Sequence, residues 1–136
     1  MNPTVDYDQQ RREHDDERRV RLVEAAQRAD AELSVVSMYD NERQALGFDF
    51  GSGQRFAEIA RKRRTRDEAV IEAHRFGYGM RIGELSASRE QCLDALRRIS
   101  AKRLKRYAHQ PHNRDTFERA RAAWRRTERA ILRMDA

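Results

Sequence analysis

The chain has 136 residues, of which 38% are hydrophobic and 38% are charged. This length favours a single domain, but the apolar share is below the roughly 45–50% of an ordinary globular chain. No apolar stretch approaches the roughly 20 residues that cross a bilayer, and the polar N-terminus does not resemble a signal peptide. The single cysteine, Cys92, excludes an intramolecular disulfide. We therefore expect a soluble, cytoplasmic protein with long helices and a thin core, or a core that a second copy completes.

The charge is basic and unevenly distributed. Residues 1–50 hold seven Arg and twelve Asp and Glu, whereas residues 51–136 hold 22 Lys and Arg and eleven Asp and Glu. Only three of the 29 basic residues are lysines. The planar guanidinium group of arginine suits bidentate contacts to phosphate or carboxylate, although a GC-rich genome explains the same bias. The asymmetry indicates an acidic or polyanionic partner for the second half.

The first helix is predicted from the apolar pattern that begins at Val20. Residues 1–19 are almost entirely polar and are interpreted as an extension that is frayed or forms a solvated helix. The heptad-like stripe consists of Leu22, Ala26, Ala29, Leu33 and Val36, and it is widened by Val23, Val35, Met38 and Tyr39. This spacing predicts one buried side of a long helix. Gly47 is a suitable C-cap.

The second helical region runs from residue 52 to about residue 76, after a glycine-rich turn that lacks the phosphate-binding P-loop pattern. Its predicted apolar positions are Phe56, Ile59, Ala60, Val70, Ile71 and His74. Between them lies RKRRTR, residues 61–66, and Thr65 with Glu68 has the pattern of a capping box. The pattern allows one helix with a solvated middle or two short helices. The basic cluster is interpreted either as a phosphate-backbone contact or as a solvated helix face.

A third helix is predicted to begin at the capping box formed by Ser88 and Gln91. One side of this helix collects the apolar residues Cys92, Leu93, Leu96, Ile99, Leu104 and Tyr107. The other side collects Arg98, Lys102 and Lys105, flanked by Arg97 and Arg106. A helix of this kind buries one stripe and offers the opposite stripe to phosphate.

Pro111 ends that helix, and Asn113 is placed to cap the last one. The last helix has an a/d seam with spacings of 3, 4, 3, 4 and 3, made of Phe117, Ala120, Trp124, Thr127, Ile131 and Met134. Such a seam predicts packing against the long first helix. The predicted fold is therefore an all-α bundle of about four to five helices, with residues 20–136 as its single domain.

The stretch MRIGELSASREQCLDAL, within residues 80–106, resembles the helix-turn-helix of bacterial regulators. The resemblance places Ile82 and Gly83 in the first helix, Ser86 and Ala87 in the turn, and Ser88 at the cap of a recognition helix. It implies that Cys92 and Leu96 pack inward. It also implies contacts to base edges from Arg89, Glu90, Gln91 and Asp94.

These patterns predict a small basic protein that binds nucleic acid, with DNA preferred, and acts as a regulator or accessory factor. The candidate contact residues are Arg61, Lys62, Arg64, Arg66, Arg89, Arg97, Arg98, Lys102, Lys105 and Arg106. The hypothesis requires residues 61–66 and 97–106 to share one exposed surface. The alternative is an adaptor or structural protein that binds another protein, or itself, through residues 20–46 and 117–134. We expect no cofactor and no metal site, because the Cys and His spacing matches no zinc motif, and no enzymatic activity.

Overall fold

The computed structural model describes residues 7–46, 52–75, 86–108 and 114–134, with side chains placed for 7–46, 57–75, 86–102 and 117–134. Within this part the chain forms helices α1 (Tyr7–Ala45), α2 (Ser52–Arg75), α4 (Arg89–Ala108) and α5 (Arg114–Leu132). The described residues contain no strand. The predicted all-α fold is confirmed.

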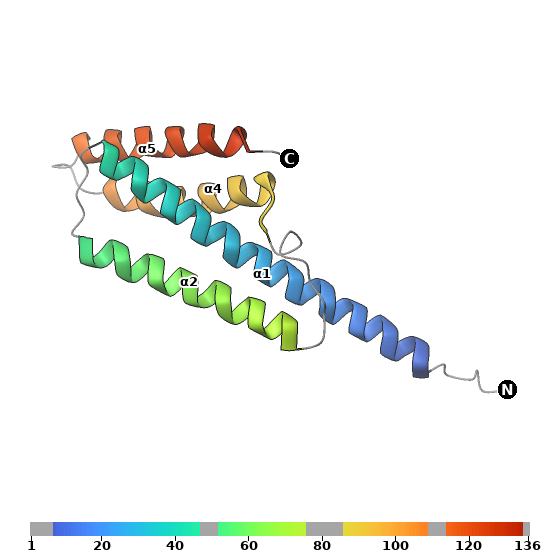
Figure 1. The fold of residues 1–136 in the computed structure, drawn as a ribbon. Coiled ribbons are helices and arrows are strands. Elements are labelled where there is room, and N and C mark those ends of the chain that lie inside the picture. Colours follow the sequence, from blue (N-terminus) through green and yellow to red (C-terminus); the bar gives the residue numbers. More distant parts are fainter. Residues whose placement is uncertain (1–6, 47–51, 76–85, 109–113, 135–136) are drawn as a thin grey trace.

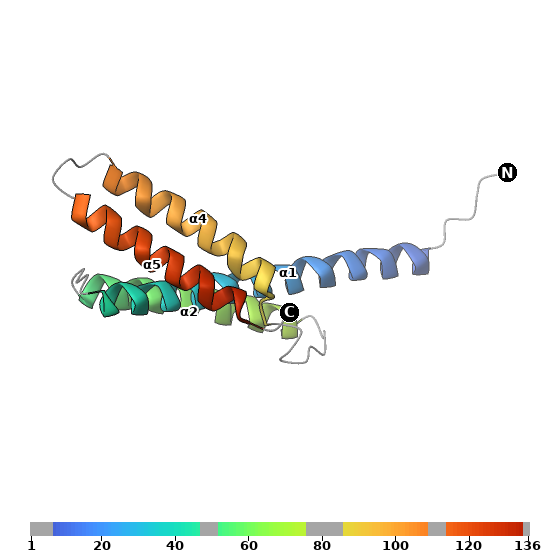
Figure 2. The same ribbon diagram turned by 90° about the horizontal axis from the view of Figure 1, so that it is seen from above.

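Helix α1 is the centre of the bundle and packs against each of the other three helices. Helix α2 runs antiparallel along one side of α1, and α4 and α5 lie side by side on another (Figures 1 and 2). The predicted contact between the first and last helices is present, because α1 packs against α5.

Helix α1 is buried on two faces rather than on the single widened stripe that the sequence predicted. Ala26 packs against α2 together with Ala73, and Ala29, Leu33 and Val36 are buried on the same side of the helix. Val35 and Tyr39 pack instead against α4 and α5. At 3.6 residues per turn the centres of these two sets lie roughly 120° apart around α1. A helix sandwiched in this way shows weak one-sided periodicity.

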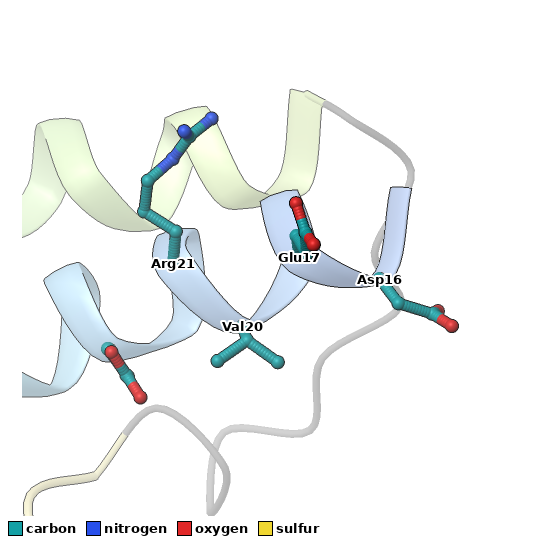
Figure 3. Close-up of a pocket in the computed structure, with 5 residues that line it drawn as sticks. Asp16, Glu17, Val20 and Arg21 are labelled. Atoms are coloured by element: carbon teal, nitrogen blue, oxygen red, sulfur yellow. The ribbon is translucent and has the colours of Figure 1, made fainter. Parts of the chain in front are cut away.

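The first part of α1, residues 7–21, forms an arm that extends beyond the other helices (Figures 1 and 2). All of its side chains are exposed except Arg18, which is partly covered. A helix that is polar all round is supported by contacts one turn apart. Two such contacts are Gln9 Nε2 to Glu13 Oε1 at 3.4 Å and Arg18 Nη2 to His14 Nε2 at 3.5 Å. An open groove of about 380 Å³ lies along the arm beside Val20 (Figure 3).

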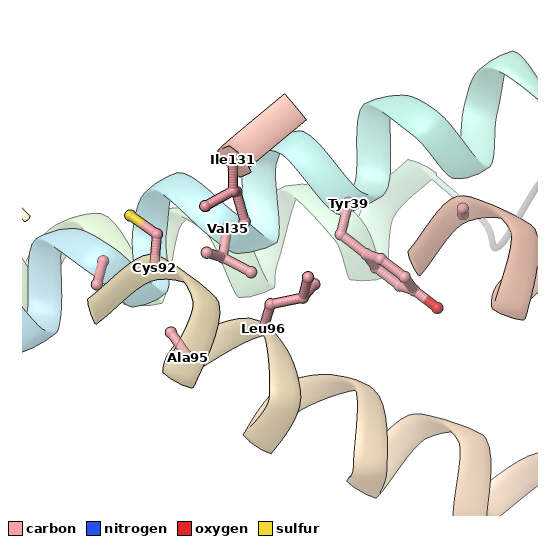
Figure 4. Packing of buried hydrophobic residues seen from close by; sticks show 8 residues of the cluster. Val35, Tyr39, Cys92, Ala95, Leu96 and Ile131 are labelled. Atoms are coloured by element: carbon pink, nitrogen blue, oxygen red, sulfur yellow. The ribbon is translucent and has the colours of Figure 1, made fainter. Parts of the chain in front are cut away.

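The main core lies where α1, α4 and α5 meet (Figure 4). Its largest fully buried side chains include Tyr39, Leu96, Ile131 and Val35. The Tyr39 hydroxyl donates a hydrogen bond to the carbonyl oxygen of Ala120 at 3.3 Å, which ties α1 to α5. Seven of the fourteen buried hydrophobic residues in the described part are alanines. The helices therefore approach one another closely, and few large side chains carry the apolar contact.

Helix α2 is a single helix, and two predictions about it are wrong. The Thr65 hydroxyl donates to the carbonyl oxygen of Arg61 at 3.0 Å, so it bonds back into the helix and caps nothing. Ala73 is the buried residue, whereas Ile71, His74 and Ala60 are exposed. The reason is that the described part of α2 packs mainly against α1 and buries only a narrow stripe. The side chain of Phe56 lies outside the described residues.

Helices α4 and α5 agree closely with their patterns. The Ser88 amide donates to Gln91 Oε1 at 2.8 Å and the Gln91 amide donates to Ser88 Oγ at 3.2 Å, which confirms this capping box. Every seam residue of α5 is buried or partly buried. On α4, Cys92 and Leu96 are buried, and Leu93 and Ile99 pack at the edge of the core. The predicted partners Leu104 and Tyr107, the caps Gly47 and Asn113, and Pro111 lie outside the described side chains.

Candidate nucleic-acid interface

The basic cluster of α2 is divided between α1 and solvent. Lys62 Nζ donates to Glu32 Oε2 at 2.9 Å. Arg66 pairs with Asp67 at 2.9 Å and approaches Asp30 Oδ1 at 3.8 Å. Both cations are therefore engaged by carboxylates. Arg61 and Arg64, with Arg63, are exposed and make no ion pair with the described residues.

Helix α4 shows the same division. Arg98 pairs with Asp94 at 3.2 Å and with Glu32 of α1 at 3.6 Å. Arg97 and Lys102 are exposed, with no ion pair in the part of the chain that the structure describes, and Arg89 is partly buried. The side chains of Lys105 and Arg106 fall outside that part.

One cation from α2 and one from α4 converge on the same carboxylate of α1. Glu32 accepts from Lys62 on one side and lies close to Arg98 on the other, so it joins α2 and α4 through α1. Arg64 lies nine positions before the buried Ala73, which places it on the side of α2 that faces away from α1. Lys62, Arg66 and Arg98, which the sequence hypothesis placed on a joint exposed surface, are instead ion-paired. Lys105 and Arg106 lie outside the described side chains, so the joint surface stays a prediction.

The densest unpaired positive charge is on α5, where sequence reasoning placed no site residue. We define the α5 arginine face as the exposed residues Arg119, Arg121, Arg125, Arg126 and Arg129 of α5 together with exposed Arg133, which directly follows the last residue of the helix. Arg126 pairs with Glu42 of α1 at 3.6 Å. The other five have no ion pair with the described residues. The signal was present in the sequence, because arginine fills six of the twelve positions outside the a/d seam between Phe117 and Met134.

Two of the residues that the helix-turn-helix resemblance implies for base contacts, Gln91 and Asp94, are bonded within the protein. The Gln91 amide group donates from Nε2 to Gln27 Oε1 at 3.1 Å. Asp94 is paired with Arg98, and the Ala87 amide donates to Asp30 Oδ2 at 3.0 Å. The start of α4 is therefore held against α1. Of the four residues implied to contact bases, only Arg89 and Glu90 make no side-chain hydrogen bond to the described residues. The residues of the implied first helix, Ile82 and Gly83, lie outside the structure's description.

Metal binding and nucleophilic catalysis can be assessed from the described His, Cys, Asp and Glu side chains. No group of three or more His, Cys, Asp or Glu side chains in the described ranges could hold a metal ion. Burial raises the pKa of the Cys92 thiol, and the nearby carboxylate of Asp30 raises it further. The thiol therefore stays protonated at neutral pH and is a poor nucleophile.

Among the helices described, none combines the length and apolar character that a bilayer span requires. Comparison with known proteins adds no assignment, because no family model, no curated protein and no solved structure matches this chain.

Proposed function

We propose that this protein binds nucleic acid through the phosphate backbone and serves as an accessory or regulatory factor, with duplex DNA as the first partner to test. The contact surface is the α5 arginine face, together with exposed Arg97 and Lys102 on the adjacent helix α4. The observation that carries the proposal is a row of six exposed arginines, five without an ion pair among the described residues.

The row is electrostatically costly in the absence of an anion. Arg121, Arg125, Arg129 and Arg133 follow one another at i, i+4 spacing. Like charges at this spacing each destabilise a helix by about 0.2–0.5 kcal/mol. A polyanion laid along α5 removes this repulsion and releases its own counterions, which is the main source of backbone affinity.

The chemistry of the face favours phosphate over base edges. The exposed residues with placed side chains from Phe117 to Met134 are the six arginines, Glu118 and Leu132. Amide and hydroxyl groups, which read bases alongside arginine in the major groove, are absent from this set. Gln91, the best base-reading group on α4, is already hydrogen bonded to Gln27. The proposed binding is therefore largely independent of sequence.

A titration of the protein into fluorescently labelled duplex DNA at several salt concentrations tests the proposal. If six arginines contact phosphates, the logarithm of the association constant falls with the logarithm of salt concentration with a slope of about −5. Scrambling the duplex sequence should leave the affinity nearly unchanged. Absence of binding at low salt would remove the proposal.

A pair of charge-matched variants locates the surface. Replacing Arg121, Arg125 and Arg129 with Glu should reduce the slope by about 3 and abolish most of the binding. Replacing Arg61, Arg63 and Arg64 of α2 with Glu makes the same change in net charge on a different side of the molecule. That control should retain most of the affinity. Equal losses in the two variants would mean that net charge, and not the α5 face, determines binding.

A further inference from the structure

The arm of α1 carries an acidic stripe on one side. The stripe consists of Glu13, Asp16, Glu17 and Glu24, and the exposed Val20 lies among them. Spacings of 3, 1, 3 and 4 residues place all five on one face of a helix. The arginines of the arm, Arg11, Arg12, Arg18 and Arg19, lie mainly on the other face. The arm therefore has an acidic side and a basic side, and both are exposed to solvent.

Within the described residues, most of the stripe makes no ion pair. Asp16, Glu17 and Glu24 are exposed and form no ion pair with the described residues. Val20 is 55% exposed at the groove along the arm. Figure 3 shows Val20 directed away from the side on which Arg21 lies, with Asp16 beside it. An apolar side chain is thus left in water among unpaired carboxylates.

The same face of α1 already pairs with α5 farther along the bundle. Glu42 lies 18 residues after Glu24, which is five full turns, so both project from the same side of α1. Glu42 contacts Arg126 of the α5 arginine face at 3.6 Å. Val35, also on this side of α1, packs against α4 and α5. The acidic stripe therefore lies on the same side of α1 as the contact with α5, in the part of α1 where that side is exposed to solvent.

The α5 arginine face is complementary to the stripe in charge and in length. The stripe spans about 17 Å from Glu13 to Glu24, and the face spans about 21 Å from Arg119 to Arg133. Leu132, which is 50% exposed, lies beside Arg125 and Arg129 and offers an apolar partner for Val20. Four carboxylates can thus meet five arginines that have no ion pair with the described residues.

The arm cannot reach the α5 face of its own chain. Helix α1 is continuous from Tyr7 to Ala45 and contains no Gly or Pro that could bend it back. The arm also points away from the bundle (Figures 1 and 2). We therefore propose that the acidic stripe of one copy docks on the α5 arginine face of a second copy.

Two copies can satisfy both surfaces at once, because each contributes one arm and one arginine face in an isologous pair. Nucleic acid would compete with the arm for that face, so phosphate binding and self-association would oppose each other. The self-association itself requires no nucleic acid and is tested in its absence, so its outcome is independent of the proposed function.

Light scattering at several salt concentrations measures the association directly. We expect a dimer at about 0.05 M salt and a monomer at about 0.5 M, because screening shortens the reach of exposed charges. The arm variant replaces Asp16, Glu17 and Glu24 with Arg, and the α5 variant replaces Arg121, Arg125 and Arg129 with Glu. Each variant alone should be monomeric at low salt. The α2 variant with Arg61, Arg63 and Arg64 replaced by Glu should remain dimeric.

Mixing the two reversed variants gives the decisive result. The basic arm of one then faces the acidic α5 of the other, and the unchanged surfaces are complementary too, so an equimolar mixture should form a heterodimer. Circular dichroism of each variant checks that the helices are intact. If a reversed variant fails to fold, the neutral versions with Asn or Gln should still shift the midpoint of dissociation to lower salt. A monomeric wild type at low salt, a dimer that is indifferent to these changes, or a mixture that stays monomeric would each overturn the proposal.

Discussion

Leu96 is one of the few large side chains in a core composed mainly of alanine. It is completely buried and packs among Val35, Tyr39 and Ile131. Leu96→Ala should therefore lower the free energy of unfolding by about 2–5 kcal/mol, because little neighbouring bulk can move into the cavity. Urea denaturation followed by circular dichroism measures this change. Leu132→Ala, at a half-exposed site, is the matched control and should change stability by less than about 0.5 kcal/mol.

Cys92 should make stability sensitive to alkaline pH. Burial first, and the Asp30 carboxylate second, raise the pKa of its thiol above the value in the unfolded chain. The folded state therefore holds this proton more tightly, and its stabilising effect is complete below the unfolded pKa of about 8.5. Stability is lost as pH rises from that value through the folded pKa. Between pH 7.5 and 9.5 the urea midpoint should fall more in the wild type than in Cys92→Ala, and parallel declines would contradict this linkage.

At the scale of the element, the start of α4 depends on its cap. Ser88 Oγ accepts from the Gln91 amide at 3.2 Å, and Gln91 also bonds to Gln27 of α1. Ser88→Ala should cost about 1 kcal/mol of stability, since a helix amide loses its partner. Ser88→Asp restores an acceptor and adds a favourable charge at the helix N-terminus, so it should match the wild type. Thermal denaturation of the two variants measures the difference, and equal destabilisation would exclude a capping role.

The buried residues were predictable for a helix with one broad buried face. They were not predictable for α1, which has two buried faces, or for α2, which has a narrow buried face. The seam of α5, from Phe117 to Met134, was predicted completely because arginine occupies six of the twelve other positions and marks the solvent side of the helix. Helix α1 was predicted to have one widened stripe, because the spacing of apolar residues does not show that a broad buried side is divided between two sets of partner helices. In α2 the apolar Ile71 suggested burial, but the contact with α1 is made by Ala69, Val70 and Ala73. Alanine carries little apolar signal, yet it is what permits close helix packing.

At the scale of the whole molecule, the division of cations into paired and unpaired sets was beyond the sequence. Residues 61–66 and 97–106 look equally exposed when each helix is considered alone. Lys62 and Arg98 become ion-paired only because α1 places Glu32 between their helices. The α5 arginines lacked a site assignment because the pattern of the last helix was interpreted only through its apolar seam. Pairing between helices depends on crossing geometry, which periodicity does not contain.

Glu32 is a counter-ion for Lys62 and Arg98. Its removal should change stability little but should raise the affinity for phosphate. Lys62, Glu32 and Arg98 retain 27%, 26% and 45% exposure, so solvent weakens their attraction. Glu32→Gln should therefore cost at most about 1 kcal/mol of stability. It releases Lys62 and leaves Arg98 paired only with Asp94, so the affinity for labelled duplex DNA should rise roughly a few-fold and the salt slope should steepen by about 0.9. Glu68→Gln makes the same charge change at an exposed residue of α2 and should do neither. If both variants gained affinity equally, the ion pairs of Glu32 would not restrain these cations, and total charge alone would govern binding.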